Sequence, residues 1–159
     1  MKEEKTNVMR LLDRKKIPYK SHVYGDGEAL SGTDVAHLLG QNPSRVFKTL
    51  VTEAGSGQHY VFVIPAAREL DLKKAARAVG EKSVSMVKSK DLLPLTGYVH
   101  GGCSPVGMKK YFRTVIDESV GEWDTFFISG GKIGYQVEMT PRDLAGIIPY
   151  ATADLTVES

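Results

Sequence analysis

The chain has 159 residues, of which 42% are hydrophobic and 25% are charged. This balance is typical of a soluble globular protein with one core, and no apolar run approaches the roughly twenty residues of a membrane span. The net charge of +2 is small for a protein that binds duplex nucleic acid non-specifically, and one cysteine cannot form a disulfide framework. We therefore expect a single domain over residues 1–159, without a signal peptide, in the cytoplasm, with neither a membrane nor DNA as partner.

The first two thirds of the chain alternate helical and extended patterns. Apolar spacing, capping residues and turn residues predict a helix over 6–16, a strand over 19–24 and a turn at Gly25-Asp26-Gly27. A second helix is expected from Ser31 or Thr33 to Leu39, followed by strands over 46–51 and 59–64 that are joined by a hairpin at 55–57. A helix over 72–79 capped by Asp71, a short strand over 84–86 and one or two helical turns over 89–93 complete this part.

The last third is mostly extended. The pattern predicts an extended run over 97–100, strands over 113–116, 125–128 and 134–138, a helix opened by Thr140 and Pro141, and a frayed tail over 151–159. Interleaved helices, hairpins and crossovers favour an α/β fold of the α+β type. We expect a mixed, mostly antiparallel sheet or a partly closed barrel with helices packed outside. Nucleotide-cofactor motifs are absent from the sequence, so no cofactor is expected.

The loop Gly101-Gly102-Cys103-Ser104-Pro105-Val106-Gly107 is the most distinctive stretch of the chain. Glycine allows positive φ and a close approach of another molecule to the backbone, and Pro105 keeps Ser104 out of helical space. Such a loop can direct backbone N–H groups towards a carboxyl or phosphate oxygen. Its composition alone favours an ordinary connection between strands, because loops collect glycine and proline.

Lys48 lies within the apolar run 46–51. Lysine is almost never fully buried unless it is paired, so two interpretations stay open. In the first, Lys48 lies on the solvent-exposed face of an edge strand. In the second, its ammonium projects into a pocket and binds a phosphate, a carboxylate or a developing oxyanion. Thr49 points to the other face of a regular strand, so the two side chains share one site only if the strand bends.

Cys103 and His100 are three residues apart, a spacing that supplies no geometry for a cysteine nucleophile and its base. We interpret Cys103 as a small neutral loop residue. The four histidines are scattered and no ligand pair has zinc spacing, so no metal is expected. Glu138, a carboxylate within a strand, is interpreted as structural.

Three stretches together resemble the YbaK/EbsC family, free-standing relatives of the editing domain inserted in bacterial prolyl-tRNA synthetase. They are Arg45-Val46-Phe47-Lys48-Thr49-Leu50, the GxxxP loop Gly101–Pro105, and Ser129-Gly130-Gly131-Lys132. The lysine–threonine pair in an apolar strand is specific in combination with the GxxxP loop. The resemblance covers nearly the whole chain and is strongest to the branch of Cys-tRNA(Pro) deacylases. Two residues depart from that branch: Cys103, where isoleucine is common, and Ile133, where a second basic residue is expected.

The resemblance implies a deacylase that clears cysteine wrongly attached to tRNA(Pro), acting on aminoacyl-tRNA with prolyl-tRNA synthetase as partner. It implies that the substrate's own thiol attacks its ester carbonyl, so that the enzyme is a hydrolase, or a lyase if the thiol cyclises. By the same resemblance Lys48 and Gly101 are catalytic. The residues that it assigns to substrate binding are Tyr24, Thr49, Gly102, Ser104 and Pro105.

Two other functions stay open at this point. One is a deacylase for another small amino acid, such as alanine on tRNA(Pro), with water or a ribose hydroxyl as the nucleophile. The other is a non-catalytic module of the same fold that binds tRNA or the synthetase; the intact Lys48 and GxxxP loop argue against it.

Overall fold

The computed structural model describes residues 5–24 and 32–158. Its helices are α1 (Asn7–Arg14), α2 (Gly32–Leu38), α3 (Leu72–Val79), α4 (Ser89–Thr96) and α5 (Pro141–Ala145), with short 3-10 helices η1 (Pro43–Arg45) and η2 (Glu118–Glu122). Its strands are β1 (Lys20–Val23), β2 (Phe47–Ala54), β3 (His59–Pro65), β4 (Val84–Met86), β5 (Arg113–Asp117), β6 (Phe126–Ser129), β7 (Tyr135–Met139) and β8 (Ala151–Ala153). None of the described helices is long and apolar enough to cross a membrane.

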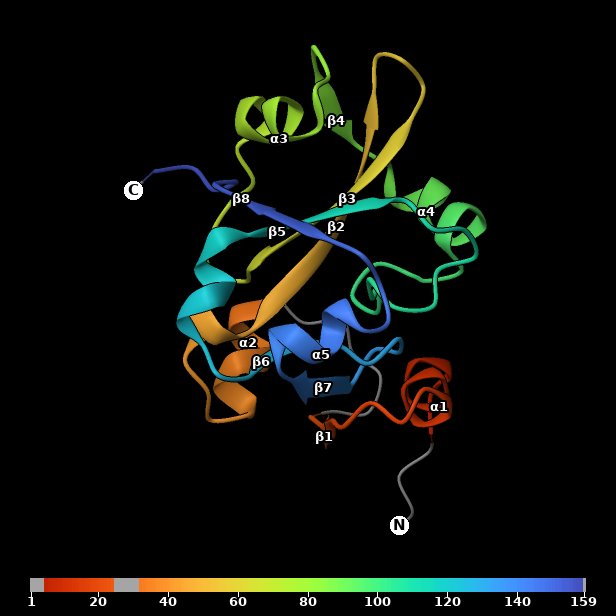
Figure 1. Cartoon of the computed structure of the whole chain (residues 1–159), viewed down its shortest axis with the longest axis vertical. Helices are drawn as coiled ribbons and strands as arrows, with labels where there is room; N and C mark the ends of the chain where they lie inside the picture. Colours follow the sequence, from red (N-terminus) through yellow and green to blue (C-terminus); the bar gives the residue numbers. More distant parts are fainter. Residues whose placement is uncertain (1–4, 25–31, 159) are drawn as a thin grey trace.

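Two sheets carry the fold, as Figure 1 shows. The larger has the strand order β4-β2-β3-β5-β8, with antiparallel pairs around β2 and parallel pairs from β3 to β8. The smaller is antiparallel, in the order β1-β7-β6. A single parallel bridge from Val46 to Phe127 joins them where β2 begins. The mixed α/β fold expected from the sequence is confirmed.

Local sequence signals place the helix ends. The hydroxyl of Thr6 accepts from the N–H of Met9, Asp71 caps α3, and Thr140 caps α5 with Pro141 in its first turn. At the other end of α3, Gly80 is left-handed (φ 73°), as helix C-caps often require. The helical turns expected over 89–93 continue as α4 to Thr96.

Each face of β2 belongs to a different core. Val51 packs with α1 and the inner face of the three-stranded sheet, whereas Leu50 packs against the cluster that contains α3. In Figure 1, α3 lies on one side of the five-stranded sheet, and α1 and the three-stranded sheet lie on the other. Residues that alternate along β2 therefore face different environments.

The expectation of a frayed tail over 151–159 is wrong. β8 pairs in parallel with β5, and Leu155 is fully buried, with its N–H donating to Asp117 Oδ1 at 3.0 Å. A three-residue strand of small side chains has no readable alternation, so only the ladder and this buried contact reveal it. The expected turn at Gly25-Asp26-Gly27 and the cap Ser31 lie outside the described residues.

Candidate active site

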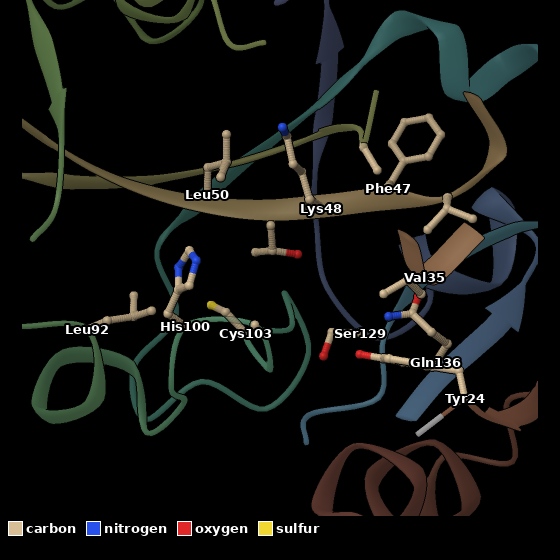
Figure 2. A pocket seen from close by; sticks show the side chains of 14 residues that line it. Tyr24, Val35, Phe47, Lys48, Leu50, Leu92, His100, Cys103, Ser129 and Gln136 are labelled. Carbon is tan, nitrogen blue, oxygen red and sulfur yellow. The ribbon is translucent and has the colours of Figure 1, made fainter. Parts of the chain in front are cut away.

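A cavity of about 320 Å³ lies against β2, next to the glycine loop (Figure 2). It gathers residues from β2, α2, α4, the smaller sheet and the loop after α4. Its lining consists of Tyr24, Val35, Val46, Phe47, Lys48, Thr49, Leu50, Ala66, Leu92, His100, Gly101, Cys103, Ser129 and Gln136.

The cavity forms where the two sheets part. β4 pairs with β2 only over Thr52 to Ala54, and the bridge to β6 lies back at Val46. Between these points, Lys48 to Leu50 are registered with β3 on one edge, and no described strand is registered with their other edge. An unpaired edge exposes backbone hydrogen-bonding groups, so this gap is suited to a polar ligand.

The smaller sheet supplies the polar wall of the cavity. Ser129 on β6 is registered with Gln136 on β7, so both side chains lie on one face of the sheet. Ser129 and Gln136 are 8% and 6% exposed, and Figure 2 shows both on the same side of β2 as Cys103. Gln136 Oε1 and Thr49 Oγ1 are buried and have no hydrogen-bond partner within the described part of the chain. Two unsatisfied oxygens in one cavity point to a ligand with hydrogen-bond donors.

The glycine loop depends on conformations that other residues rarely adopt. Gly101 has φ of 90°, and a Cβ on Gly102 would lie 3.1 Å from the backbone nitrogen of Ile133. The GxxxP loop is therefore pressed against the second glycine loop, 129–134. The N–H of Gly102 donates to Val99 O at 3.0 Å, whereas the N–H of Gly101 has no backbone acceptor among the described residues.

Ser104 and Pro105 shape this loop from within. Ser104 is fully buried and its hydroxyl accepts from the N–H of Val106 at 3.3 Å. Pro105 lines a separate hollow with Phe112 and Ile148. Neither residue is part of the cavity lining.

Lys48 and Thr49 leave β2 in opposite directions, because the ladder with β3 is regular from Phe47 to Glu53. Figure 2 shows Lys48 and Leu50 on one side of the strand and His100 and Cys103 on the other. No bend brings Lys48 to the side of Thr49, yet both residues line the cavity, which follows the strand edge. Burial lowers the pKa of Lys48, and the charge of Glu69 opposes part of that effect.

Cys103 is 7% exposed, and burial raises the pKa of its thiol to about 12. At neutral pH it is a thiol and not the thiolate that a cysteine nucleophile needs. This supports its interpretation as a small neutral residue. His100 lines the same cavity and is exposed. In the described residues, no group of three or more His, Cys, Asp or Glu side chains is placed to hold a metal ion.

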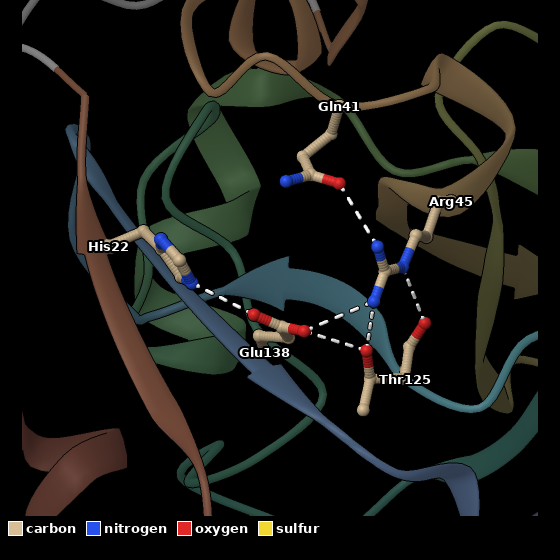
Figure 3. A network of polar contacts seen from close by, with 5 residues as sticks. All are labelled: His22, Gln41, Arg45, Thr125 and Glu138. Carbon is tan, nitrogen blue, oxygen red and sulfur yellow. Dashed lines mark hydrogen bonds and ion pairs between the residues drawn. The ribbon is translucent and has the colours of Figure 1, made fainter.

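A polar network surrounds Glu138, two residues along β7 from Gln136 (Figure 3). Glu138 accepts hydrogen bonds from His22 Nε2 at 3.0 Å, Thr125 Oγ1 at 2.7 Å and Arg45 at 3.1 Å. Arg45 also donates to the carbonyl of Thr125 and to Gln41. Burial alone would raise the pKa of Glu138, but the hydrogen bonds from Thr125 and His22 and the charge of Arg45 outweigh it and hold that pKa below its ordinary value. Glu138 is structural, as expected.

Of the residues predicted for the site, four line the cavity and three do not. Those in the lining are Tyr24, Lys48, Thr49 and Gly101, and those outside it are Gly102, Ser104 and Pro105. Sequence reasoning missed Gln136 and assigned no binding role to Ser129. The signal for Gln136 is a glutamine in the middle of an apolar strand, the same anomaly that drew attention to Lys48.

Comparisons with known proteins identify the family that the chain is similar to. The family described as "Aminoacyl-tRNA editing domain" matches residues 27–147. The chain is 42% identical over 157 residues to a protein of Enterococcus faecalis named "Putative Cys-tRNA(Pro)/Cys-tRNA(Cys) deacylase EbsC", covering 98% of this chain and 96% of that one. It is also 26% identical over 132 residues to a proline–tRNA ligase of Fervidobacterium nodosum, of which it spans 23%.

The fold recurs in solved structures. One, described as "a putative trans-editing enzyme for prolyl tRNA synthetase", superposes with a TM-score of 0.83 at 23% identity, covering 96% of this chain and 99% of that one. The family match spans most of the chain, and the match to the Enterococcus faecalis protein is nearly end to end. This chain therefore belongs to the aminoacyl-tRNA editing domain family.

Proposed function

We propose that the protein is a trans-editing deacylase that clears cysteine from mischarged tRNA(Pro), with the thiol of the bound cysteine as the nucleophile. Family membership and the similarity to the Enterococcus faecalis protein support deacylation of aminoacyl-tRNA. One observation favours the substrate-thiol mechanism. The single cysteine of the chain lies in the cavity as a neutral thiol, with its pKa raised to about 12 by burial.

The reaction needs no protein nucleophile. The substrate's sulfur forms a bond to its own ester carbonyl carbon, the bond from that carbon to the ribose oxygen breaks, and the ribose oxygen takes the thiol proton. The products are a cyclic thioester of cysteine and tRNA with a free terminal hydroxyl. Holding the two reacting groups together can account for much of such a rate, because the attack is already intramolecular.

The protein contributes electrostatic stabilisation and positioning. The N–H of Gly101, which has no backbone acceptor among the described residues, is assigned to the carbonyl oxygen, which gains negative charge as sulfur attacks. Lys48 rises from the opposite face of β2 to Cys103, so we assign its ammonium to the terminal adenosine, through its phosphate, and not to the carbonyl. Tyr24 and Thr49 border the space left for the amino acid. Gly102, Ser104 and Pro105 act on the substrate only by fixing the loop.

The test is release of amino acid from tRNA(Pro) charged with cysteine, alanine or serine, with and without prolyl-tRNA synthetase. Rapid release of cysteine alone is the expected result. Equal or faster release of alanine would replace this proposal by a deacylase that uses water or a ribose hydroxyl. Binding of charged tRNA without any release would indicate a non-catalytic module.

A further inference from the structure

Gln136 is an unusual residue for the place it occupies. It lies on β7, the middle strand of the smaller sheet, between His22 on β1 and Ser129 on β6. Its side chain is on the cavity face, and the whole residue is 6% exposed. Burial of an amide oxygen without a partner is unfavourable, because the oxygen loses its hydrogen bonds to water. A role in ligand binding explains why an acceptor is retained here.

The cavity holds a second oxygen in the same condition. Thr49 Oγ1 is also buried without a partner among the described residues, and it belongs to the opposite wall, on β2. No carboxylate is present in the cavity lining as described. The cavity therefore offers neutral oxygen acceptors to a group that donates several hydrogen bonds.

An aminoacyl ester carries such a group beside its reacting carbon. Its α-amino group is bonded to the carbon next to the carbonyl, and an ammonium donates three hydrogen bonds and accepts none. Gln136 is near the loop that we assign to the carbonyl: it is registered with Ser129, and the loop after Ser129 packs on Gly102. A ligand whose carbonyl lies at Gly101 places its α-amino group within this part of the cavity.

We propose that Gln136 Oε1, with Thr49 Oγ1, binds the α-amino group of the amino acid esterified to tRNA. This inference rests on the proposed function, because it takes an aminoacyl ester as the ligand. It assigns Gln136 a binding role and makes the protein selective for esters with a free α-amine. Aminoacyl-tRNA whose amine is acylated, as in a nascent peptide, is then a poor ligand.

The experiment measures binding without turnover. An acceptor-stem minihelix carries either alanine or propionate at its 3′ end in an uncleavable amide linkage, so that the two ligands differ only in the α-amine. Wild-type protein should bind the alanyl ligand at least about ten-fold more tightly, a difference of roughly 1.4 kcal/mol. Gln136→Met, which keeps the length of the side chain but removes the acceptor, should abolish most of that difference and leave propionyl binding unchanged.

Three further variants sharpen the result. Gln136→Glu should restore or increase the preference for the alanyl ligand, because a carboxylate also accepts from an ammonium. Thr49→Val should remove part of the preference. Gln58→Leu, at an exposed glutamine in the β2–β3 hairpin, should behave like wild type.

Two results would overturn the inference. One is equal binding of alanyl and propionyl ligands by wild-type protein. The other is an unchanged alanyl preference in folded Gln136→Met. Loss of binding by Gln136→Met only for ligands that carry the terminal ribose 2′-hydroxyl would then assign the acceptor to the ribose. Release of cysteine from Cys-tRNA(Pro) is scored separately, so a protein that binds through the amine without deacylating refutes the proposed function and not the amine site.

Discussion

Lys48 and Thr49 are neighbours in the sequence but serve different sides of β2. Thr49 faces the side that holds Cys103, whereas the aliphatic stem of Lys48 lies over the opposite side, where burial lowers the pKa of its ammonium. Long cationic side chains commonly bury their stems and keep the charged end near water. Burial therefore makes the charged form of Lys48 less stable at this position. A role in binding an anionic group explains why a lysine is present here.

Lys48→Met should fold with an unchanged or higher melting temperature, because methionine replaces the stem without burying a charge. Release of cysteine should fall by at least about ten-fold in kcat/KM, equivalent to roughly 1.4 kcal/mol of transition-state stabilisation. Lys73→Met, at an exposed position on α3, is the matched control and should leave activity unchanged. Activity of Lys48→Met within a few-fold of wild type would show that Lys48 has no part in the reaction.

Cys103→Ala should leave cysteine release within about three-fold of wild type, since the buried thiol is not the nucleophile. The same substitution should change how the free energy of unfolding depends on pH in the alkaline range. The ordinary pKa of the thiol is 9.0, and the folded chain raises it to about 12. The neutral thiol thus adds stability that is complete below pH 9 and is lost as the pH rises through about 12.

The measurement for Cys103 is denaturant unfolding across alkaline pH. Above pH 9, the unfolding free energy of wild type should fall faster than that of Cys103→Ala, by up to about 1.4 kcal/mol per pH unit. Burial raises the pKa of Tyr98 to about 12 and the charge of Cys103 adds to that effect, so the difference between the two curves includes the coupling of Cys103 to Tyr98. Parallel pH curves would contradict the burial of the thiol, and loss of all release in folded Cys103→Ala would restore Cys103 as the nucleophile.

At the scale of elements, α1 holds the two glycine loops of the site together. A Cβ on Gly131 would lie 2.7 Å from Val8 Cγ2, and a Cβ on Gly107 would lie 2.9 Å from Leu11 Cδ1. Both helix residues come from α1, and the glycines come from the loops 129–134 and 101–107. Close packing of this kind leaves no room for a methyl group and fixes the spacing of the loops.

Gly131→Ala should separate α1 from the site. Gly57 has nearly the same φ, 89° against 91° for Gly131, but a Cβ there would meet nothing within 4 Å. Gly57→Ala therefore measures the backbone strain alone, and Gly131→Ala should cost about 1–3 kcal/mol more in unfolding free energy because of the clash. Only Gly131→Ala should also reduce cysteine release. Equal losses in the two variants would mean that α1 does not position the loops.

The sequence predicted elements well where a local rule decides them. α3 has its ends marked by Asp71 and Gly80, and it forms over the expected residues. β8 has no such marks: it is stabilised by pairing with β5, a partner more than thirty residues away. The site residues differ in the same way. Lys48 could be predicted because a lysine within an apolar strand is unusual. The position of Gln136 in the cavity depends on the register of three strands.

At the scale of the whole molecule, a net charge of +2 limits how strongly the isolated protein can hold tRNA. We expect weak binding of uncharged tRNA that falls with salt, since each phosphate contact releases counterions with a slope of about −0.7 to −0.9 in log K against log salt. Binding measured by anisotropy at several salt concentrations tests this. Selectivity for tRNA(Pro) should appear only with prolyl-tRNA synthetase present; tight selective binding by the protein alone at physiological salt would contradict it.

The central claim is that the reacting nucleophile belongs to the substrate. The most direct measurement is the single-turnover rate of release from tRNA(Pro) charged with cysteine, S-methylcysteine, serine or alanine, together with the competition constant of each. All four keep the α-amine and the ester, so they should compete for the site with similar strength, whereas cysteine should be released at least about a hundred-fold faster, a difference of roughly 2.7 kcal/mol. Release of S-methylcysteine or alanine at the rate of cysteine would show that the thiol is not the nucleophile.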